Sequence, residues 1–527
     1  MDPVLRRVIA VLSMAPAMAH GHAQMANSGR QMAGEAASPQ SGEWKFYHEH
    51  VLGTSLEISI KARDRESARE AEKAVLGSFD KMDRIFSAHR AESEFSRWEQ
   101  SRFEAVHVSP VLFAVLKAFD QWREKTNGAL DPSVAAAMQL WRQATSEGRR
   151  PDEDEIARTL EAIKQPHWSL DADQQTATRL SETPLALASF VKSWIADQAA
   201  HAALDAGAKG VMLNVGGDVV VRGAMQQRVD LVDPRHAADN LASLDSVMVS
   251  DRAVATSGIY RRGFSLQEGL LHEAPQYGHL FDPHTALPVA HILSSTVIAA
   301  DASTAGALAT AFSVMPVSES QKLATAMPGV DYLLVLADGS QVRSVGWNAH
   351  SMVPAPQNVQ AARVAYALPA HTSGMWNPAF ELTLGIELPR INDARYRRPY
   401  VAVWVEDGDH YPVRTLALWS GNPRWLPDLK QWYRDDQIRM MSEGSDISRT
   451  VGSATRPAGS YILKWDGRDN EGHLVKAGNY TVVVEAVREH GGYQIVRHAM
   501  NFNAHADRAE LPAGSELGKI SFEYKKR

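Results

Sequence analysis

The chain has 527 residues, of which 44% are hydrophobic and 22% charged, with a formal net charge of −7. Chains of this length exceed a single hydrophobic core and divide into domains, and the composition is that of ordinary globular protein. The acidic balance and the lack of a sustained Lys/Arg run argue against nucleic-acid binding, and the absence of cysteine excludes disulfides, thiolate metal sites and a lipid anchor on an N-terminal Cys.

The first 23 residues are predicted to be a secretory signal peptide. Arg6 and Arg7 form a basic n-region, residues 8–18 form a short apolar segment, and Ala17-Met18-Ala19 is an A-x-A cleavage site. The apolar segment is too short to span a bilayer, and no other stretch of the sequence is long enough. We therefore expect a soluble periplasmic protein with no transmembrane segment in the mature chain, preceded by a disordered lead-in over residues 24–43.

Residues 44–347 mix helix and strand signals, which predicts an α+β domain. Hydrophobic residues three and four apart predict a helix over residues 65–86, and Ser109-Pro110 is the start of another. Further helices are expected over residues 153–163 and 187–204, and strands at residues 51–60, 211–215, 219–221, 228–232, 294–298 and 332–335.

A linker over residues 348–374 precedes a second domain of different character. Residues 375–505 contain short alternating strands separated by Asp-Gly and Asn/Gly turns, which predicts an all-β, immunoglobulin-like sandwich. Residues 506–527 are expected to form a C-terminal tail. The many tryptophans of this domain suit core packing better than a carbohydrate-binding face; they are Trp404, Trp419, Trp425, Trp432 and Trp465.

Three short segments pair backbone-permissive residues with polar side chains: NVGGD (214–218), ATSGIYRR (255–262) and HLFDPHTALP (279–288). Glycines at 216 and 217 allow close backbone approach, and successive amides in such turns can form an anion-binding nest. Tyr260 can stack on a planar ring, and His279 can shuttle a proton near neutral pH. Each segment alone suits an ordinary polar turn, but together they indicate a phosphate-bearing ligand.

Two further segments carry candidate ligand contacts. Lys192, in ASFVKSWIAD, can reach a pyrophosphate, with Asp197 as its expected salt-bridge partner; a surface lysine is the alternative. TNGALDP can present the Asp131 carboxylate and the Ala129 main chain to a ligand, or it is simply a helix C-cap at Gly128 followed by a turn.

Eight segments, in this order, resemble the ApbE-type FAD:protein FMN transferase family: LGTSLEISI, FSAHRAESEFSRW, TNGALDP, KSWIAD, NVGGD, ATSGIY, HLFDPHTALP and AGALATAF. The resemblance implies an ApbE-like domain over residues 44–347. It also implies an enzyme that binds FAD and magnesium, cleaves the pyrophosphate and attaches FMN to a Thr or Ser of a periplasmic redox protein. The region after residue 375 resembles a periplasmic domain of unknown function found fused to such proteins.

The resemblance and the residues together assign site roles. His279 and Asp282 are the candidate catalytic residues, and the Ser189 carbonyl and Thr310 are the candidate metal ligands. The residues expected to hold FAD are Ala129, Leu130, Asp131, Lys192, Gly216, Gly217, Asp218, Ser257, Gly258, Tyr260 and Phe281.

Several positions depart from the family's pattern. Gly306 replaces the Asp that ligates magnesium, which is expected to weaken the metal site because Mg²⁺ needs hard oxygen ligands in near-octahedral geometry. Asp301 is the nearest carboxylate that a shifted loop would offer. Ser193 replaces the Gly after the lysine, and Ala186 replaces an acidic residue six positions before it.

Two alternatives therefore stand beside an active transferase. One is a degenerate family member that binds flavin without transferring it, and the other is a periplasmic accessory or scaffold protein acting through its tryptophan-rich domain. The chain lacks the family's flavin-acceptor pattern, Asp-Gly/Ala with Ser/Thr three residues after the Gly/Ala. An acceptor is consequently expected to be another protein.

Overall fold

The computed structural model describes residues 42–527 except 89, 237, 239, 242, 260–262, 266–275, 353–373, 392–395, 421–422, 444–446, 448–451, 454 and 490. The predicted signal peptide and nearly all of the lead-in lie outside the described residues, as do Tyr260 and most of the linker. In the described part of the chain, no helix has the length and apolar character needed to cross a membrane.

An eight-stranded antiparallel sheet organises the first part of the chain, in the order β1-β2-β6-β7-β10-β15-β16-β17. Its strands are β1 (Gly42–Val51), β2 (Thr54–Ala62), β6 (Gly210–Val215), β7 (Asp218–Gly223), β10 (Ala253–Gly258), β15 (Ile292–Ala299), β16 (Asp331–Leu336) and β17 (Gln341–Arg343). The central strands are almost fully buried, because both faces of the sheet are covered.

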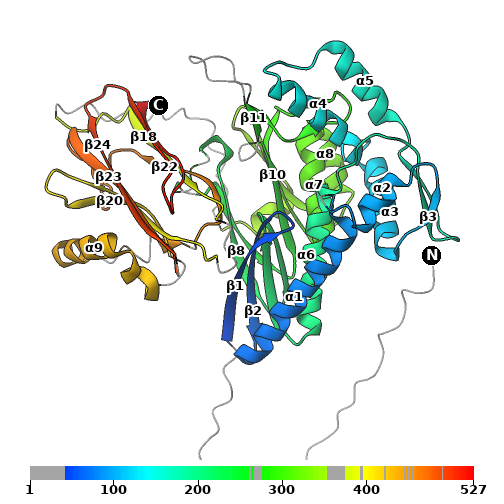
Figure 1. Cartoon of the computed structure of the whole chain (residues 1–527), viewed down its shortest axis with the longest axis horizontal. Coiled ribbons are helices and arrows are strands. Elements are labelled where there is room, and N and C mark those ends of the chain that lie inside the picture. The colour runs from blue at the N-terminus through cyan, green and yellow to red at the C-terminus, as the bar shows by residue number, and fades with distance from the viewer. Residues whose placement is uncertain are drawn as a thin grey trace, which may run out of the picture. The chain divides into compact units, whose positions relative to one another are not determined.

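Three helices cover one face of this sheet: α1 (Arg65–Phe86), α6 (Ala188–Asp205) and α7 (Ala302–Val314) (Figure 1). The buried residues of α1 are the three- and four-spaced set expected from the sequence. α6 and α7 are instead buried nearly all round and rich in alanine, which lets them pack closely on each other and on the sheet. The other face is covered by the β8 (Gln226–Leu231) and β9 (Asp245–Ser250) hairpin and by Trp347.

A mainly helical segment lies between α1 and α6 in the sequence. It contains α2 (Glu94–Gln100), α3 (Pro110–Lys125), α4 (Ala135–Ser146) and α5 (Glu153–Lys164), with a small sheet of β3 (Ala105–His107), β5 (Thr176–Arg179) and β4 (Trp168–Asp171). Ser109 caps α3 and Pro110 occupies its first turn, as predicted. The rest of the chain up to residue 352 includes β11 (Gly263–Ser265), β12 (Gln276–Gly278), β13 (Phe281–Asp282), β14 (Leu287–Pro288) and α8 (Val317–Thr325).

Two antiparallel-rich sheets share one core in the C-terminal part of the chain. One has the order β22-β18-β26-β25 and the other β21-β20-β19-β23-β24. Their strands are β18 (Phe380–Leu388), β19 (Tyr400–Glu406), β20 (Pro412–Trp419), β21 (Gly452–Ser453), β22 (Gly459–Trp465), β23 (Gly478–Val487), β24 (Tyr493–Phe502), β25 (Asp507–Leu511) and β26 (Ile520–Lys526). The prediction of an all-β domain is confirmed; the immunoglobulin-like detail stays a prediction.

Residues 506–527 do not form a separate tail. They supply β25 and β26, and β26 pairs with β18 along its whole length. The alternate residues Ile520, Phe522 and Tyr524 of β26 point into the core. The helix α9 (Lys430–Glu443) was not expected in this all-β region; the fully buried Glu485 carboxylate accepts hydrogen bonds from its first amides. Four of the five tryptophans assigned to packing are buried, as predicted, and Trp425 is partly buried.

Candidate functional site

One end of the eight-stranded sheet gathers the segments singled out in the sequence. β6 ends at Val215 and β10 at Gly258, whereas β7 begins at Asp218 and β2 at Thr54. Because neighbouring strands are antiparallel, the starts of β2 and β7 lie at the same end of the sheet as the ends of β6 and β10. The structure therefore brings NVGGD, ATSG and the LGTS segment together.

The Gly216-Gly217 turn does not present a free anion nest. The Gly216 amide donates to the Ser55 carbonyl (3.2 Å) and the Gly217 amide to the Asn214 side chain (3.0 Å). Both glycines have positive φ, +57° and +101°. A Cβ at Gly216 would lie 2.5 Å from Thr54 Oγ1, so the close approach that requires glycine is made by Thr54. Both amides have protein acceptors in this conformation, so their contact with phosphate stays a prediction.

Lys192, Ser193 and Asp218 form a compact polar group, here called the lysine cluster. Lys192 Nζ lies 3.1 Å from Asp218 Oδ2, and the Ser193 hydroxyl donates to the same oxygen at 2.7 Å. Ser193 and Asp218 are buried, whereas the Lys192 side chain is 28% exposed. The buried Ser193 hydroxyl thus holds the Asp218 carboxylate on its protein side, and the Lys192 ammonium group lies on its solvent side.

Asp197 is not the partner of Lys192. It binds Arg222 through two guanidinium nitrogens at 2.8 Å and accepts the Ala302 amide. Five residues along an α-helix correspond to a rotation of about 140° from Lys192, so the two side chains leave different faces of α6. Asp197 anchors α7 to the sheet instead.

A second group, the hydroxyl cluster, consists of Ser189, Ser257 and Thr310. The Thr310 hydroxyl donates to the Ser189 carbonyl (3.2 Å) and lies 3.4 Å from the Ser257 hydroxyl. Ser295 pairs directly opposite Ser257, and within the described residues the buried hydroxyls of Ser189 and Ser295 have no hydrogen-bond partner. Unsatisfied buried hydroxyls beside a carbonyl are suited to an additional polar occupant such as water.

The hydroxyl cluster is a poor fit for Mg²⁺. Its oxygens are neutral, whereas protein sites for this ion are usually built on one or two carboxylates. Gly306, one turn before Thr310, contributes no ligand. Asp301 accepts the Thr304 amide as the N-cap of α7 and is exposed. Thr310 lies nine positions further along the chain, about 13.5 Å along the helix axis, so Asp301 does not replace the missing carboxylate.

A third group, the loop bridge, joins TNGALDP to HLFDPHT. His284 Nδ1 lies 2.8 Å from Asp282 Oδ1, and His284 Nε2 lies 2.7 Å from the Asn127 carbonyl oxygen. Both neighbours are acceptors, an arrangement that favours the doubly protonated, cationic imidazole over the neutral one. Burial lowers the pKa of His284, but the Asn127 hydrogen bond and the contacts with Asp282 outweigh it and the net shift is upward.

The remaining candidates around this bridge have structural partners. Asp131 caps the turn at Pro132–Val134, accepts two hydrogen bonds from Ser133 and pairs with Arg123 at 2.8 Å. Ala129 and Leu130 are buried. Phe281 belongs to a small core with Trp141 (ring centroids 6.1 Å apart), so its ring packs against protein. His279 is partly buried just before β13.

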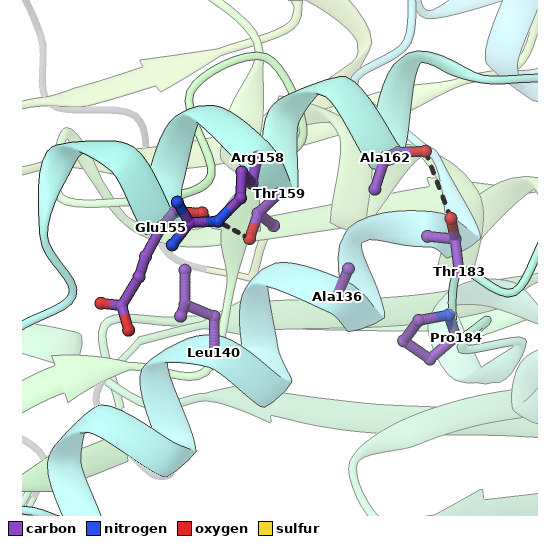
Figure 2. A pocket seen from close by; sticks show the side chains of 8 residues that line it. All are labelled: Ala136, Leu140, Glu155, Arg158, Thr159, Ala162, Thr183 and Pro184. Atoms are coloured by element: carbon purple, nitrogen blue, oxygen red, sulfur yellow. Dashed lines mark hydrogen bonds between the residues drawn. The ribbon is translucent and has the colours of Figure 1, made fainter.

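Two cavities flank the helical segment. One, of about 610 Å³, is lined by the loop bridge, Asp131, Arg123 and the C-terminal end of α5. Cavities of this size hold small-molecule ligands. The other, of about 250 Å³, lies between α4 and α5 and is lined mainly by Ala136, Leu140, Ala162 and Pro184 (Figure 2). Its two threonine hydroxyls donate to backbone carbonyls, and no predicted site residue lines it.

Sequence reasoning missed three residues that organise these groups. Ser193 was noted only as a departure from a pattern, His284 only as part of a motif, and Arg123 not at all. Arg123 lies eight residues before Asp131, a spacing that does not by itself predict a contact. The two side chains meet because the turn at Gly128 (φ +86°) reverses the chain.

Comparison with known proteins identifies this arrangement. The model of the ApbE family matches residues 52–334, more than half of the chain. The chain belongs to the ApbE family. Residues 381–519 match a family described as a predicted periplasmic protein of unknown function.

Among relatives of this ApbE-family chain, the FAD:protein FMN transferase of Treponema pallidum is 27% identical over 319 residues, covering 56% of this chain and 86% of the relative. That of Haemophilus influenzae is 24% identical over 311 residues, covering 55% and 86%. The crystal structure of an ApbE protein from Thermotoga maritima superposes with a TM-score of 0.51 at 26% identity, covering 58% of this chain and 99% of that one. The fold and family expected from the sequence are confirmed.

Proposed function

We propose that the chain transfers FMN from FAD to a Ser or Thr hydroxyl of a periplasmic protein. The observation that carries the proposal is the lysine cluster, because it combines a partly exposed cation with the start of a helix at the end of the sheet where the NVGGD and ATSG segments meet. The FAD:protein FMN transferases among its relatives support the same reaction class.

Phosphate binding follows from the electrostatics of α6. Its N-cap is Leu187, which has no side chain able to cap the first amides, so the positive helix end is left for a ligand. Lys192, one turn further, contacts a phosphate oxygen by turning away from Asp218. Ser193 continues to donate to Asp218 after this movement, which limits the cost of the unpaired carboxylate.

The transfer itself requires positioning and one proton acceptor. The acceptor's hydroxyl oxygen forms a bond to the phosphorus of the FMN half of FAD, and the bond between that phosphorus and the bridging pyrophosphate oxygen breaks. AMP leaves with the electron pair, and the hydroxyl proton passes to a base, for which His279 is our candidate. Asp282 holds His284 and is assigned a positioning role in place of the catalytic one.

Because the hydroxyl cluster is a poor fit for Mg²⁺, no step is assigned to the ion. When a divalent cation is bound in an enzyme of this class, it neutralises charge on the pyrophosphate. Among the described residues, Lys192 and the first amides of α6 supply positive charge at this place. Ser189 and Thr310 stay candidate ligands by position only.

FAD binding tests the proposal directly. We expect Lys192→Ala to weaken FAD binding about 10- to 100-fold, since a charged hydrogen bond contributes about 1.5–3 kcal/mol. Lys322→Ala, on the exposed side of α8, is the matched control and should bind like the wild type. Calorimetric titration with FAD measures both. Equal affinity in all three proteins would remove the lysine cluster from the site.

Transfer is tested with an acceptor domain that carries Asp-Gly or Asp-Ala followed by Thr three residues after the Gly or Ala. We expect covalent flavin fluorescence on the acceptor after denaturing electrophoresis, AMP release, and neither product when the acceptor Thr is replaced by Ala. Tight FAD binding without either product would favour the second candidate, a flavin-binding relative without transferase activity. That candidate is supported by the hydroxyl cluster around Thr310, because its uncharged oxygens offer no carboxylate to a divalent cation.

A further inference from the structure

Gly306 and Ser193 are in contact between two antiparallel helices. A Cβ at Gly306 would lie 2.4 Å from Ser193 Oγ and 3.0 Å from Ser193 Cβ. Ser193 is 1% exposed and α7 is buried on all sides at this point, so neither helix can move outward to make room for a larger side chain. Residue 306 can be only glycine while Ser193 keeps its position.

The Ser193 hydroxyl is also the donor that holds Asp218. Its bond to Asp218 Oδ2 is 2.7 Å long, and Lys192 Nζ shares that oxygen. A rotation of Ser193 that made room for a side chain at 306 would break this hydrogen bond inside a buried site. The space beside residue 306 is thus occupied by the uncharged Ser193 hydroxyl, which donates a hydrogen bond to Asp218, the partner of Lys192.

We infer that Ser193 and Gly306 are a matched pair in which an internal hydrogen bond occupies the space that a cation-binding carboxylate at 306 would need, and that Ser193 holds Asp218 so that Lys192 can bind the ligand's phosphates without a divalent cation. The second clause rests on the flavin binding proposed above. The first is independent of any ligand, because it concerns the packing of α6 on α7.

Ion binding tests the pair without flavin, using Gly306→Asp, Ser193→Gly and the double variant. We expect Mn²⁺ titration by calorimetry to show no micromolar site in the wild type or in either single variant. The double variant, which gains a carboxylate and loses the obstructing hydroxymethyl group, should bind Mn²⁺ at least about tenfold more tightly than either. Micromolar Mn²⁺ binding by the wild type, or equal binding by Gly306→Asp and the double variant, would contradict the inference.

Thermal unfolding gives a second readout if the double variant does not bind ions. Gly306→Ala should lower the Tm by about 3 °C or more in the Ser193 background, because overpacking strains the core. In the Ser193→Gly background the same change should leave the Tm unchanged or raise it, since alanine favours helix. An equal drop in both backgrounds would show that Ser193 is not what excludes a side chain at 306.

Flavin affinity tests the second clause. The wild-type Kd for FAD should change less than about twofold when magnesium is added in excess, and a tightening of about tenfold or more would overturn it. Ser193→Ala should weaken FAD binding and lower the Tm, because it removes a donor from the buried Asp218 carboxylate, and it should produce no new magnesium response. If no protein of the set binds FAD, the proposed function and the second clause fail together, while the ion and Tm results still decide the pairing.

Discussion

At the scale of single residues, charge placement decides what the site can do. The sequence identified Lys192 and Asp218 separately, but the pairing between them comes from the packing of α6 on the β6–β7 hairpin. The helical rotation of about 140° between positions 192 and 197 was available from the sequence and argued against Asp197. Ser193, which the sequence shows only as a replaced glycine, has a meaning only when Gly306 is placed against it.

His284 gives the molecule a pH-dependent element. Its folded-state pKa is raised, so its contribution to stability is fully present below the unfolded value of about 6.5 and is lost as pH rises through the folded pKa. Because the side chain is about half exposed, we expect this contribution to be about 1 kcal/mol at most.

We therefore expect the wild-type Tm of this domain to fall between pH 6 and pH 8, and His284→Gln to flatten that dependence. His107→Gln, an exposed histidine on β3, is the control and should leave the slope unchanged. Thermal melts across this pH range measure both. An unaltered slope in His284→Gln would mean that the loop bridge carries no titrating charge.

At the scale of elements, turns and helices differ in how well the sequence specifies them. The helix over residues 65–86 was predicted to the residue because its apolar positions recur with helical period. α7 was not predicted as a helix, because a segment that is apolar on every side has no such period. β1 was missed because its alternating Trp44, Phe46 and His48 directly follow the Gly- and Ser-rich lead-in.

The β6–β7 turn should respond steeply to small substitutions. Gly216→Ala adds a Cβ at positive φ and 2.5 Å from Thr54 Oγ1, so we expect a loss of about 1–3 kcal/mol. Gly217→Ala carries only the φ strain, since nothing lies within 4 Å, and should cost less. Gly77→Ala, exposed within α1 with open space around it, should stabilise by about 0.5–1 kcal/mol. Denaturant unfolding ranks the three, and a different order would contradict the turn geometry.

At the scale of the whole molecule, the described residues form separate hydrophobic cores on either side of the linker. The largest core before it contains no residue beyond 342, and the sandwich core contains none before 376. A domain boundary at residues 348–374 stays a prediction, made from the change in composition there. The roles of β25 and β26 were not predictable, because two short strands after a run of polar residues have no local signal that distinguishes them from a tail.

Independent cores predict two thermal transitions in scanning calorimetry. Trp465→Ala, in the sandwich core, should lower one transition by several degrees, since such truncations cost about 3–5 kcal/mol. Leu213→Ala, in the first core, should lower the other. A single transition that both variants shift equally would show that the two regions unfold as one unit.

The contact between positions 193 and 306 also means that substitutions at these two positions do not act independently. A side chain at 306 and a serine at 193 compete for the same space, so a protein bearing both would lose stability. The effects of single substitutions at 193 and 306 on the free energy of unfolding are therefore not additive. Placing a carboxylate at 306 in this chain takes two substitutions rather than one.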